Sequence, residues 1–143
     1  MKQKDDFYTL RGYQSNEMPE LTPAMEDYLE MIYRLLQQKN VVRIGELSSM
    51  LHVKPSSTTK MIQHLKAIDF VISEKYGYIQ LTEKGKREGR YLLYRHEVLQ
   101  KFLTTLNNSE NELEEVEKIE HFLSKKTIQN LDRLTEYLRE QIP

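Results

Sequence analysis

The sequence predicts a mostly α-helical fold with one small β-hairpin, in which an N-terminal winged helix-turn-helix precedes an all-helical domain. Apolar residues recur at i, i+3 and i+4 through most of the chain after residue 20, as in amphipathic helices. Two short runs of β-branched and aromatic residues near the middle flank a loop that contains glycine, as in a hairpin. We place an N-terminal extension at residues 1–20, the winged helix-turn-helix at 21–82 and the helical domain at 83–143.

Composition narrows the class of protein. The 143 residues suffice for one domain or two small interlocked ones. The chain has no cysteine, which excludes disulfides and thiolate metal sites. It has no apolar run near the ~20 residues that cross a bilayer, and its N-terminal residues lack the apolar segment of a signal peptide. We therefore expect a soluble, cytoplasmic protein with no membrane contact.

The first helix should begin after Thr22 and end near residues 38–40. Thr22 is placed to act as N-cap, and Pro23 to occupy the first helical position. Residues 41–43 should be short and extended, and residues 44–51 should form a second helix. The side chains expected to face the core are Met25, Tyr28, Leu29, Ile32, Tyr33, Leu36, Leu47 and Leu51.

The middle of the chain predicts a third helix, the hairpin and a long fourth helix. Pro55 stands where a helix begins, after a turn over residues 52–54. Residues 70–72 and 78–81 predict the two strands. Thr82 should cap a helix to about residue 105, which would tolerate two internal glycines at a cost of about 1 kcal/mol each.

The end of the chain predicts two more helices. Ser109 and Glu112 have the spacing of a capping box, so a helix should open at Ser109. Ser124 should end that helix and cap a last amphipathic one over roughly residues 125–138.

The exposed side of the third helix has the composition of a DNA-reading surface. Small hydroxyl residues let the backbone approach base edges, glutamine can bond adenine bidentately, and lysines can neutralise phosphates. Residues 54–101 carry ten Lys and Arg against five Asp and Glu, whereas both ends of the chain are net acidic. The predicted contacts are Lys54, Pro55, Ser56, Ser57, Thr58, Lys60 and Gln63, with Lys75 and Tyr76 in the wing loop. The plainer alternative is a capped helix with solvated lysines.

Three separate stretches carry carboxylates and imidazoles on one side of a helix. In the third stretch the spacing is i, i+3, i+4, which places all three groups on the same face. Carboxylate oxygens and imidazole nitrogens form a hard ligand set that suits manganese or ferrous iron. The predicted ligands are Asp27, Glu30, His96, Glu117, Glu120 and His121.

Each stretch taken alone has a simpler explanation. Two acids early in a helix complement its dipole, a histidine in an apolar helix is usually a satisfied core residue, and a glutamate-rich segment can be a solvated face. The combination favours a metal site, because four carboxylates gathered together repel one another and two divalent cations cancel their charge. Such a site would be loose when empty and tight when filled, as a metal sensor requires.

The chain resembles the diphtheria-toxin-repressor family of metal-dependent repressors from residue 22 to about residue 140. The matching segments are residues 22–30 (TPAMEDYLE), 54–61 (KPSSTTKM), 74–76 (EKY), 81–86 (LTEKGK), 94–97 (YRHE) and 116–121 (VEKIEH). In this family the iron-responsive branch has methionine at the position of Asp27 and the manganese-responsive branch has aspartate. Residues 1–20 extend beyond the family's shorter pattern.

The resemblance implies a binuclear site built from the six ligands, with two Mn²⁺ per subunit and Fe²⁺ as the alternative metal. It also implies a homodimer formed through the C-terminal helices. That dimer would bind double-stranded operator DNA and repress genes for metal uptake when the metal is bound.

Two other functions remain to be compared with this one. The first is a DNA-binding regulator of another kind, either an iron- or other-metal-responsive member of the same family or a metal-independent winged-helix regulator in which the acids are structural. The second is a carboxylate-bridged dimetal enzyme, which would need paired Glu-x-x-His motifs. Lys118 stands three residues before His121, and there is no second such motif, so we do not expect an enzyme.

Overall fold

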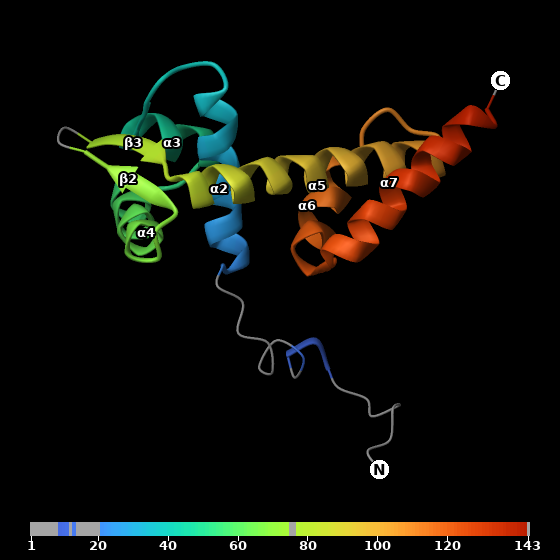
Figure 1. Ribbon diagram of the computed structural model, residues 1–143, viewed down its shortest axis with the longest axis horizontal. Coiled ribbons are helices and arrows are strands. Elements are labelled where there is room, and N and C mark those ends of the chain that lie inside the picture. Colours follow the sequence, from blue (N-terminus) through green and yellow to red (C-terminus); the bar gives the residue numbers. More distant parts are fainter. Residues whose placement is uncertain (1–8, 12, 14–20, 75–76, 143) are drawn as a thin grey trace, which may run out of the picture.

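The computed structural model describes residues 9–11, 13, 21–74 and 77–142. Figure 1 shows a winged unit at one end and a helical unit at the other, joined by one long helix. The elements are α2 (Pro23–Leu36), β1 (Val42–Arg43), α3 (Ile44–Leu51), α4 (Pro55–Ala67), β2 (Val71–Ser73), β3 (Tyr78–Leu81), α5 (Glu83–Asn107), α6 (Leu113–Ile119), the 3₁₀ turn η2 (Glu120–Phe122) and α7 (Lys125–Glu140).

Helix α2 begins as the sequence predicts. The Thr22 side chain accepts a hydrogen bond from the Met25 amide, and Pro23 occupies the first turn. The helix ends at Leu36, a little earlier than expected, because Gln37 already caps it with bonds to two carbonyls of the last turn. Its buried face includes Leu29 and Ile32, which are fully enclosed.

The predicted hairpin is part of a three-stranded antiparallel sheet with the order β1-β3-β2. Strand β1 was expected only as an extended segment, but it pairs with β3 through Val42 opposite Ile79. Both of these side chains are fully buried, so burial on one face explains why so short a segment joins the sheet. The tip of the wing, with Lys75 and Tyr76, lies outside the described residues.

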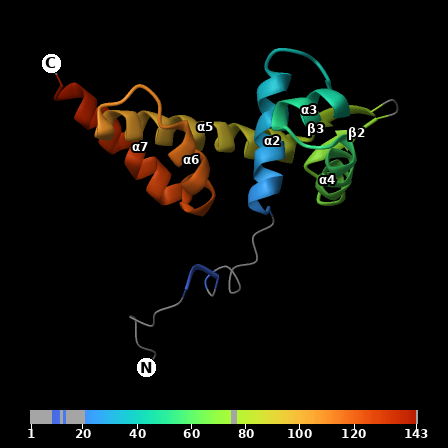
Figure 2. The same cartoon turned by 180° about the vertical axis from the view of Figure 1, so that it is seen from behind.

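Helix α5 is shared by two hydrophobic cores (Figures 1 and 2). Its N-terminal half contributes Leu92 to the core of the winged unit. Its C-terminal half contributes Val98, Leu99 and Leu103 to a second core, which also contains Val116 of α6 and Ile128 of α7. None of the described helices, α5 included, is both long and apolar enough to span a membrane. One continuous helix therefore sets the spacing between the two units.

The two internal glycines of α5 are contact points of close packing. A Cβ at Gly85 would lie 2.0 Å from the Phe70 carbonyl oxygen, and one at Gly89 would lie 2.7 Å from Tyr33 Cβ. From the sequence, these glycines were expected only to destabilise the helix slightly, and no packing role was assigned to them. They allow α5 to approach the end of β2 and the side of α2 more closely than any larger residue would.

The predicted capping box at Ser109 is wrong. Helix α6 starts at Leu113 with Glu112 as its N-cap, whose own side chain makes no capping bond, and the Leu113 amide donates to Asn111 Oδ1 at 3.0 Å. The Ser109 hydroxyl instead donates to the Glu112 carboxylate at 2.6 Å, and the Glu112 amide is bound by Gln100 of α5 at 3.0 Å. Tertiary contacts with α5 therefore take up the groups that a capping box would have paired locally.

Helix α7 begins as predicted and leaves an apolar surface uncovered. Ser124 accepts from the Thr127 amide at 3.1 Å, and Ile128 is fully buried against α5. Large apolar side chains nevertheless stay exposed on α7 and nearby, at Leu106, Phe122, Leu134, Tyr137 and Ile142. We refer to these five residues as the C-terminal apolar face.

Gly85→Ala should lower the free energy of unfolding by about 1–3 kcal/mol, because its methyl group would meet a backbone carbonyl that cannot move aside. Urea unfolding followed by circular dichroism measures this change.

Gly45→Ala is the matched control, since a Cβ there meets nothing within 4 Å. This substitution in α3 should leave stability unchanged or raise it by up to about 1 kcal/mol. Equal losses in the two variants would contradict the close-packing explanation.

Candidate metal centre and nucleic-acid interface

The structure brings together side chains from every stretch that the sequence selected for metal binding. They come from α2 (Asp27, Glu30), α5 (His96), α6 (Glu117) and η2 (Glu120, His121). Two groups of three each have ligand atoms within 4.8 Å of one another, namely Asp27, Glu120 and His121, and Glu30, His96 and Glu120. Glu120 belongs to both groups and so lies between them.

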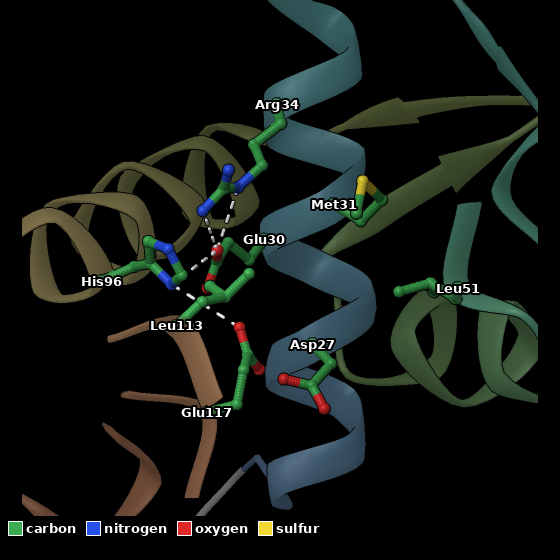
Figure 3. Close-up of a pocket in the computed structure, with 8 residues that line it drawn as sticks. All are labelled: Asp27, Glu30, Met31, Arg34, Leu51, His96, Leu113 and Glu117. Carbon is green, nitrogen blue, oxygen red and sulfur yellow. Dashed lines mark hydrogen bonds and ion pairs between the residues drawn. The ribbon is translucent and has the colours of Figure 1, made fainter. Parts of the chain in front are cut away.

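His96 faces three of these carboxylates. Its Nδ1 lies 3.2 Å from Glu120 Oε2, 3.6 Å from Glu117 Oε1 and 3.8 Å from Glu30 Oε2. Figure 3 shows the His96 ring directed toward Glu30 and Glu117, with Asp27 beyond them on α2. Glu117 is the one predicted carboxylate ligand outside the two groups of three. It lies next to His96 of the second group, with 48% of its side chain exposed to solvent.

His121 uses its two ring nitrogens differently. Nε2 lies 3.2 Å from Asp27 Oδ1 and 3.9 Å from Glu120 Oε1, so it faces the cluster. Nδ1 lies 2.7 Å from Glu26 Oε1, on the side away from those two groups. A neutral imidazole that donates from Nδ1 to Glu26 would present the Nε2 lone pair to a cation.

Glu120 is the feature that best tests whether the cluster fits a cation. Its side chain is fully buried, and its Oε1 has no hydrogen-bond partner among the described residues. A buried carboxylate oxygen without a partner costs several kcal/mol of desolvation. A divalent cation with oxygen preference would satisfy it, and the surrounding donors are those that such a cation takes.

Protons partly compensate the crowded negative charge. Burial raises the pKa of Glu30 and of Glu117, and repulsion from Glu120 raises both further. The hydrogen bond to Glu120 raises the pKa of His96. Burial alone would lower the pKa of His121, but hydrogen bonds to Asp27 and Glu26 outweigh it and raise that pKa to about 10. A metal ion at this site must therefore displace protons.

Three charged residues at this site were not expected from the sequence. Arg95, almost fully buried, lies 3.3 Å from Glu26 Oε1 and 3.4 Å from His121 Nδ1. Arg34 pairs with Glu30 at 2.6 Å. Glu26, an acid in the first turn of α2, was not among the expected site residues. The signal that could have found it is Arg95, because an arginine among the apolar positions of α5 needs a buried acid.

The acid-acid-histidine triplet is not on one continuous α-helix, as the spacing had suggested. Helix α6 stops at Ile119, and Glu120 and His121 belong to the 3₁₀ turn η2. The change of winding places Glu120 in the interior while Glu117, one turn earlier, remains half exposed.

A pocket of about 290 Å³ gives access to the second group of three. Figure 3 draws the residues that line it, among them Met31 of α2 and Leu51 of α3. The pocket also includes Leu113 at the start of α6. The pocket is therefore lined by residues of both units of the protein.

The outer surface of α4 presents most of the predicted DNA contacts. Lys54, Pro55, Ser56, Ser57, Lys60 and Gln63 are all exposed. The N-terminus of α4 has no side-chain cap and no acidic residue in its first turn. Its free amides are thus available to an anionic group such as a phosphate.

Thr58 is the exception, and its predicted DNA contact is wrong. The residue is fully buried, and its hydroxyl accepts from Ser48 Oγ of α3 at 2.9 Å and lies 3.5 Å from the Tyr28 hydroxyl of α2. At the fourth position of α4 the side chain points back into the winged unit, so it packs the helices together and does not face outward.

A winged helix-turn-helix joined to a helical unit, with a carboxylate and imidazole cluster between them, defines a metal-dependent transcriptional regulator. Residues 20–79 match the family described as iron dependent repressor, N-terminal DNA binding domain. Residues 82–142 match iron dependent repressor, metal binding and dimerisation domain. The chain belongs to this family of metal-responsive DNA-binding repressors, as its motifs predicted.

Named relatives agree with this assignment. The chain is 44% identical over 120 residues to the HTH-type transcriptional regulator MntR of Geobacillus thermodenitrificans (strain NG80-2), covering 83% of this chain and 85% of the relative. It is 43% identical over 120 residues to the MntR of Bacillus subtilis (strain 168), covering 83% and 84%. These relatives are transcriptional regulators, in agreement with the expectation that the protein is not an enzyme.

Solved structures show the same fold. The manganese regulator SloR superposes with a TM-score of 0.71 at 28% identity, covering 82% of this chain. The structure of ScaR with bound Zn²⁺ gives 0.66 at 30% identity, covering 79% of this chain. This chain spans 55% of the SloR chain and 54% of the ScaR chain.

In chelator, the metal-free protein should lose stability as the pH rises from about 6.5 to about 10. The folded pKa of His121 is about 10 against its ordinary 6.5, so the folded state holds a proton that the unfolded chain releases. The stabilisation from this proton is fully present below pH 6.5 and is lost as the pH rises through the folded pKa. Each pKa unit between the folded and unfolded values corresponds to about 1.4 kcal/mol of stability. Urea unfolding across this range measures it.

His121→Gln should flatten that pH dependence, whereas His64→Gln on the exposed side of α4 should leave it intact. An unchanged slope in His121→Gln would count against the proposed origin of the effect.

Proposed function

We propose that this protein is a manganese-responsive repressor in which two divalent ions hold the DNA-reading unit against the helical unit. The observation that supports this best is the buried Glu120 oxygen, which has no hydrogen-bond partner among the described residues and lies between two groups of carboxylate and imidazole ligands. Relatives named as MntR and the manganese regulator SloR favour Mn²⁺ over Fe²⁺ as the activating metal.

Asp27, Glu120 and His121 would hold one ion, and Glu30, His96 and Glu120 the other. Glu117, next to His96, would complete the second position from its half-exposed side. Bound Mn²⁺ supplies positive charge that cancels the repulsion among these carboxylates. Glu26 would position His121 by accepting a hydrogen bond from its Nδ1, which leaves Nε2 for the ion, and Arg95 would hold Glu26 in place.

The proposed ligands connect two units, each of which has its own hydrophobic core. Asp27 and Glu30 belong to α2 of the winged unit, while Glu117, Glu120 and His121 belong to α6 and η2 beside the second core. Gathering them around ions would fix α2 relative to the C-terminal helices. The division of the chain near Thr82 into a reading domain and a metal-binding and dimerisation domain is part of this proposal.

DNA contact would fall on the exposed positions of α4. Lys60 would contact phosphates and Gln63 base edges, and the uncapped N-terminus of α4 would receive a phosphate. The wing residues Lys75 and Tyr76 remain proposed contacts. The expected partner is double-stranded operator DNA, and the expected location is the cytoplasm.

The C-terminal apolar face would form the homodimer interface. Its exposed leucine, phenylalanine and tyrosine side chains lie on α5, η2 and α7, where a two-fold partner could bury them. Two reading heads would then meet two operator half-sites.

Operator binding tests the proposal directly. In excess chelator the wild-type dimer should bind operator DNA weakly. Added Mn²⁺ should raise the affinity by at least about a hundredfold, which is the change in affinity that a strong allosteric effector produces. Fluorescence anisotropy with labelled operator gives both affinities. Equal affinity with and without metal would sink the sensor function and favour a regulator independent of metal.

Glu117→Ala and His121→Ala should each abolish the response to Mn²⁺ while the protein stays a folded dimer, because each removes one proposed ligand. Glu115→Gln, an exposed acid on the same helix as Glu117, should respond like the wild type. Circular dichroism and sedimentation check folding and assembly. Unfolding of the ligand variants would favour a structural role for these acids.

Asp27→Met should shift the metal that activates operator binding from Mn²⁺ toward Fe²⁺, because a thioether is a softer ligand than a carboxylate. Anaerobic titrations of each metal with the labelled operator measure this preference. An unaltered preference for Mn²⁺ would argue against Asp27 as a ligand.

A further inference from the structure

Arg34 stands out among the residues around the metal centre because it brings a permanent positive charge into a site built for cations. It lies in the last turn of α2, one turn after Glu30, and lines the same pocket as Glu30, His96 and Glu117. Figure 3 shows its guanidinium group directed inward, toward Glu30.

The contact between Arg34 and Glu30 is unlike that of a surface ion pair. Nε and one terminal nitrogen of Arg34 donate to the same oxygen, Glu30 Oε2, at 2.9 and 2.6 Å. Glu30 itself is buried, with 7% of its surface exposed. Charge-assisted hydrogen bonds to a buried carboxylate are about twice as strong as neutral ones, so this pair has a real preference to stay formed.

The oxygen that Arg34 occupies is one that a metal ion would need. Glu30 Oε2 is the Glu30 atom that lies 3.8 Å from His96 Nδ1, and Glu30, His96 and Glu120 form one of the two groups of three. A divalent ion among these groups would stand close to the guanidinium group, and like charges at such distances repel strongly.

The arginine also has somewhere to go. Its side chain is 37% exposed and borders an open pocket, so it can turn toward solvent without unfolding α2. Arginine remains charged at any pH the protein meets, and therefore leaves by moving and not by losing a proton.

We propose that Arg34 is a tethered counter-cation that compensates Glu30 in the metal-free protein and that the metal ion at the Glu30, His96 and Glu120 position must displace. This inference rests on the proposed function and deepens it. Arg34 then raises the concentration of metal needed to fill that position, while the position formed by Asp27, Glu120 and His121 is less affected.

Titration of Mn²⁺ into the full-length protein tests this role, with calorimetry for affinity and electron paramagnetic resonance for the number of ions bound. In Arg34→Gln the weaker binding step should tighten by at least about tenfold, since no charged group has to be displaced. The number of ions per subunit should not change. Arg34→Lys keeps the charge but not the second hydrogen bond to Glu30, so it should tighten this step less than Arg34→Gln does.

Thermal unfolding in chelator provides an independent readout with the opposite sign. Arg34→Gln should lower the unfolding midpoint of the metal-free protein, because Glu30 loses its counter-charge. A residue that merely stabilised the fold or oriented Glu30 would weaken both metal binding and stability when replaced. Arg87→Gln, an exposed arginine of α5, should alter neither quantity.

Mn²⁺ binding by Arg34→Gln that equals or falls below that of the wild type would overturn the inference. In that case the wild type would still bind two ions and respond on operator DNA, and the proposed function would stand. If the wild type itself bound no Mn²⁺, the proposed function and the inference would both be overturned.

Discussion

The arrangement of this protein depends on a buried carboxylate, Glu120, where α2, α5 and η2 meet. Its side chain is out of reach of water, yet one oxygen has no hydrogen-bond partner in the described structure. Carboxylates of Asp27, Glu30 and Glu117 gather around it, and in the described part of the chain two imidazoles and the Arg34 side chain, which pairs with Glu30, oppose their charge. A cation bound at this junction would therefore lower its electrostatic energy. A ligand that stabilises one arrangement of a protein in this way is the physical requirement for sensing that ligand.

The long helix α5 determines which contacts between the two units can change when the charge at this junction changes. It belongs to both cores, and Gly85 and Gly89 let it lie directly against Phe70 and Tyr33. The winged unit therefore packs firmly on the first half of α5. The link between α2 and η2 is different in kind, because it consists of charged side chains such as Asp27 and His121. Interactions of this kind respond to protons and ions, whereas hydrocarbon packing does not.

Much of the fold and the identity of the six clustered side chains could be predicted from the sequence. Thr22, Thr82 and Ser124 capped the helices expected of them, because capping depends on neighbours within four residues. Predictions that depend on distant groups fared less well. Ser109 failed as a cap because Gln100 binds the Glu112 amide, and β1 joined the sheet through a partner 37 residues away at Ile79.

The same distinction explains the errors at the site. The composition of this helix suggested that Thr58 was one of several outward hydroxyl residues, but packing against α3 and α2 decides its direction. The role of Glu26 could not be seen locally, since its partners Arg95 and His121 are 69 and 95 residues away. Local rules identify which chemistry is present, and the tertiary fold decides which of those groups face one another.

The hydroxyl groups of Tyr28, Thr58 and Ser48 have a consequence for the movement of the reading head. Tyr28 follows Asp27 on α2, Thr58 lies inside α4, and Ser48 belongs to α3, so one small polar cluster joins all three helices. Together with the shared hydrophobic core, this cluster would pass a displacement of α2 on to α4. In a dimer, such coupling would alter the distance between the two recognition helices while leaving the shape of each one unchanged.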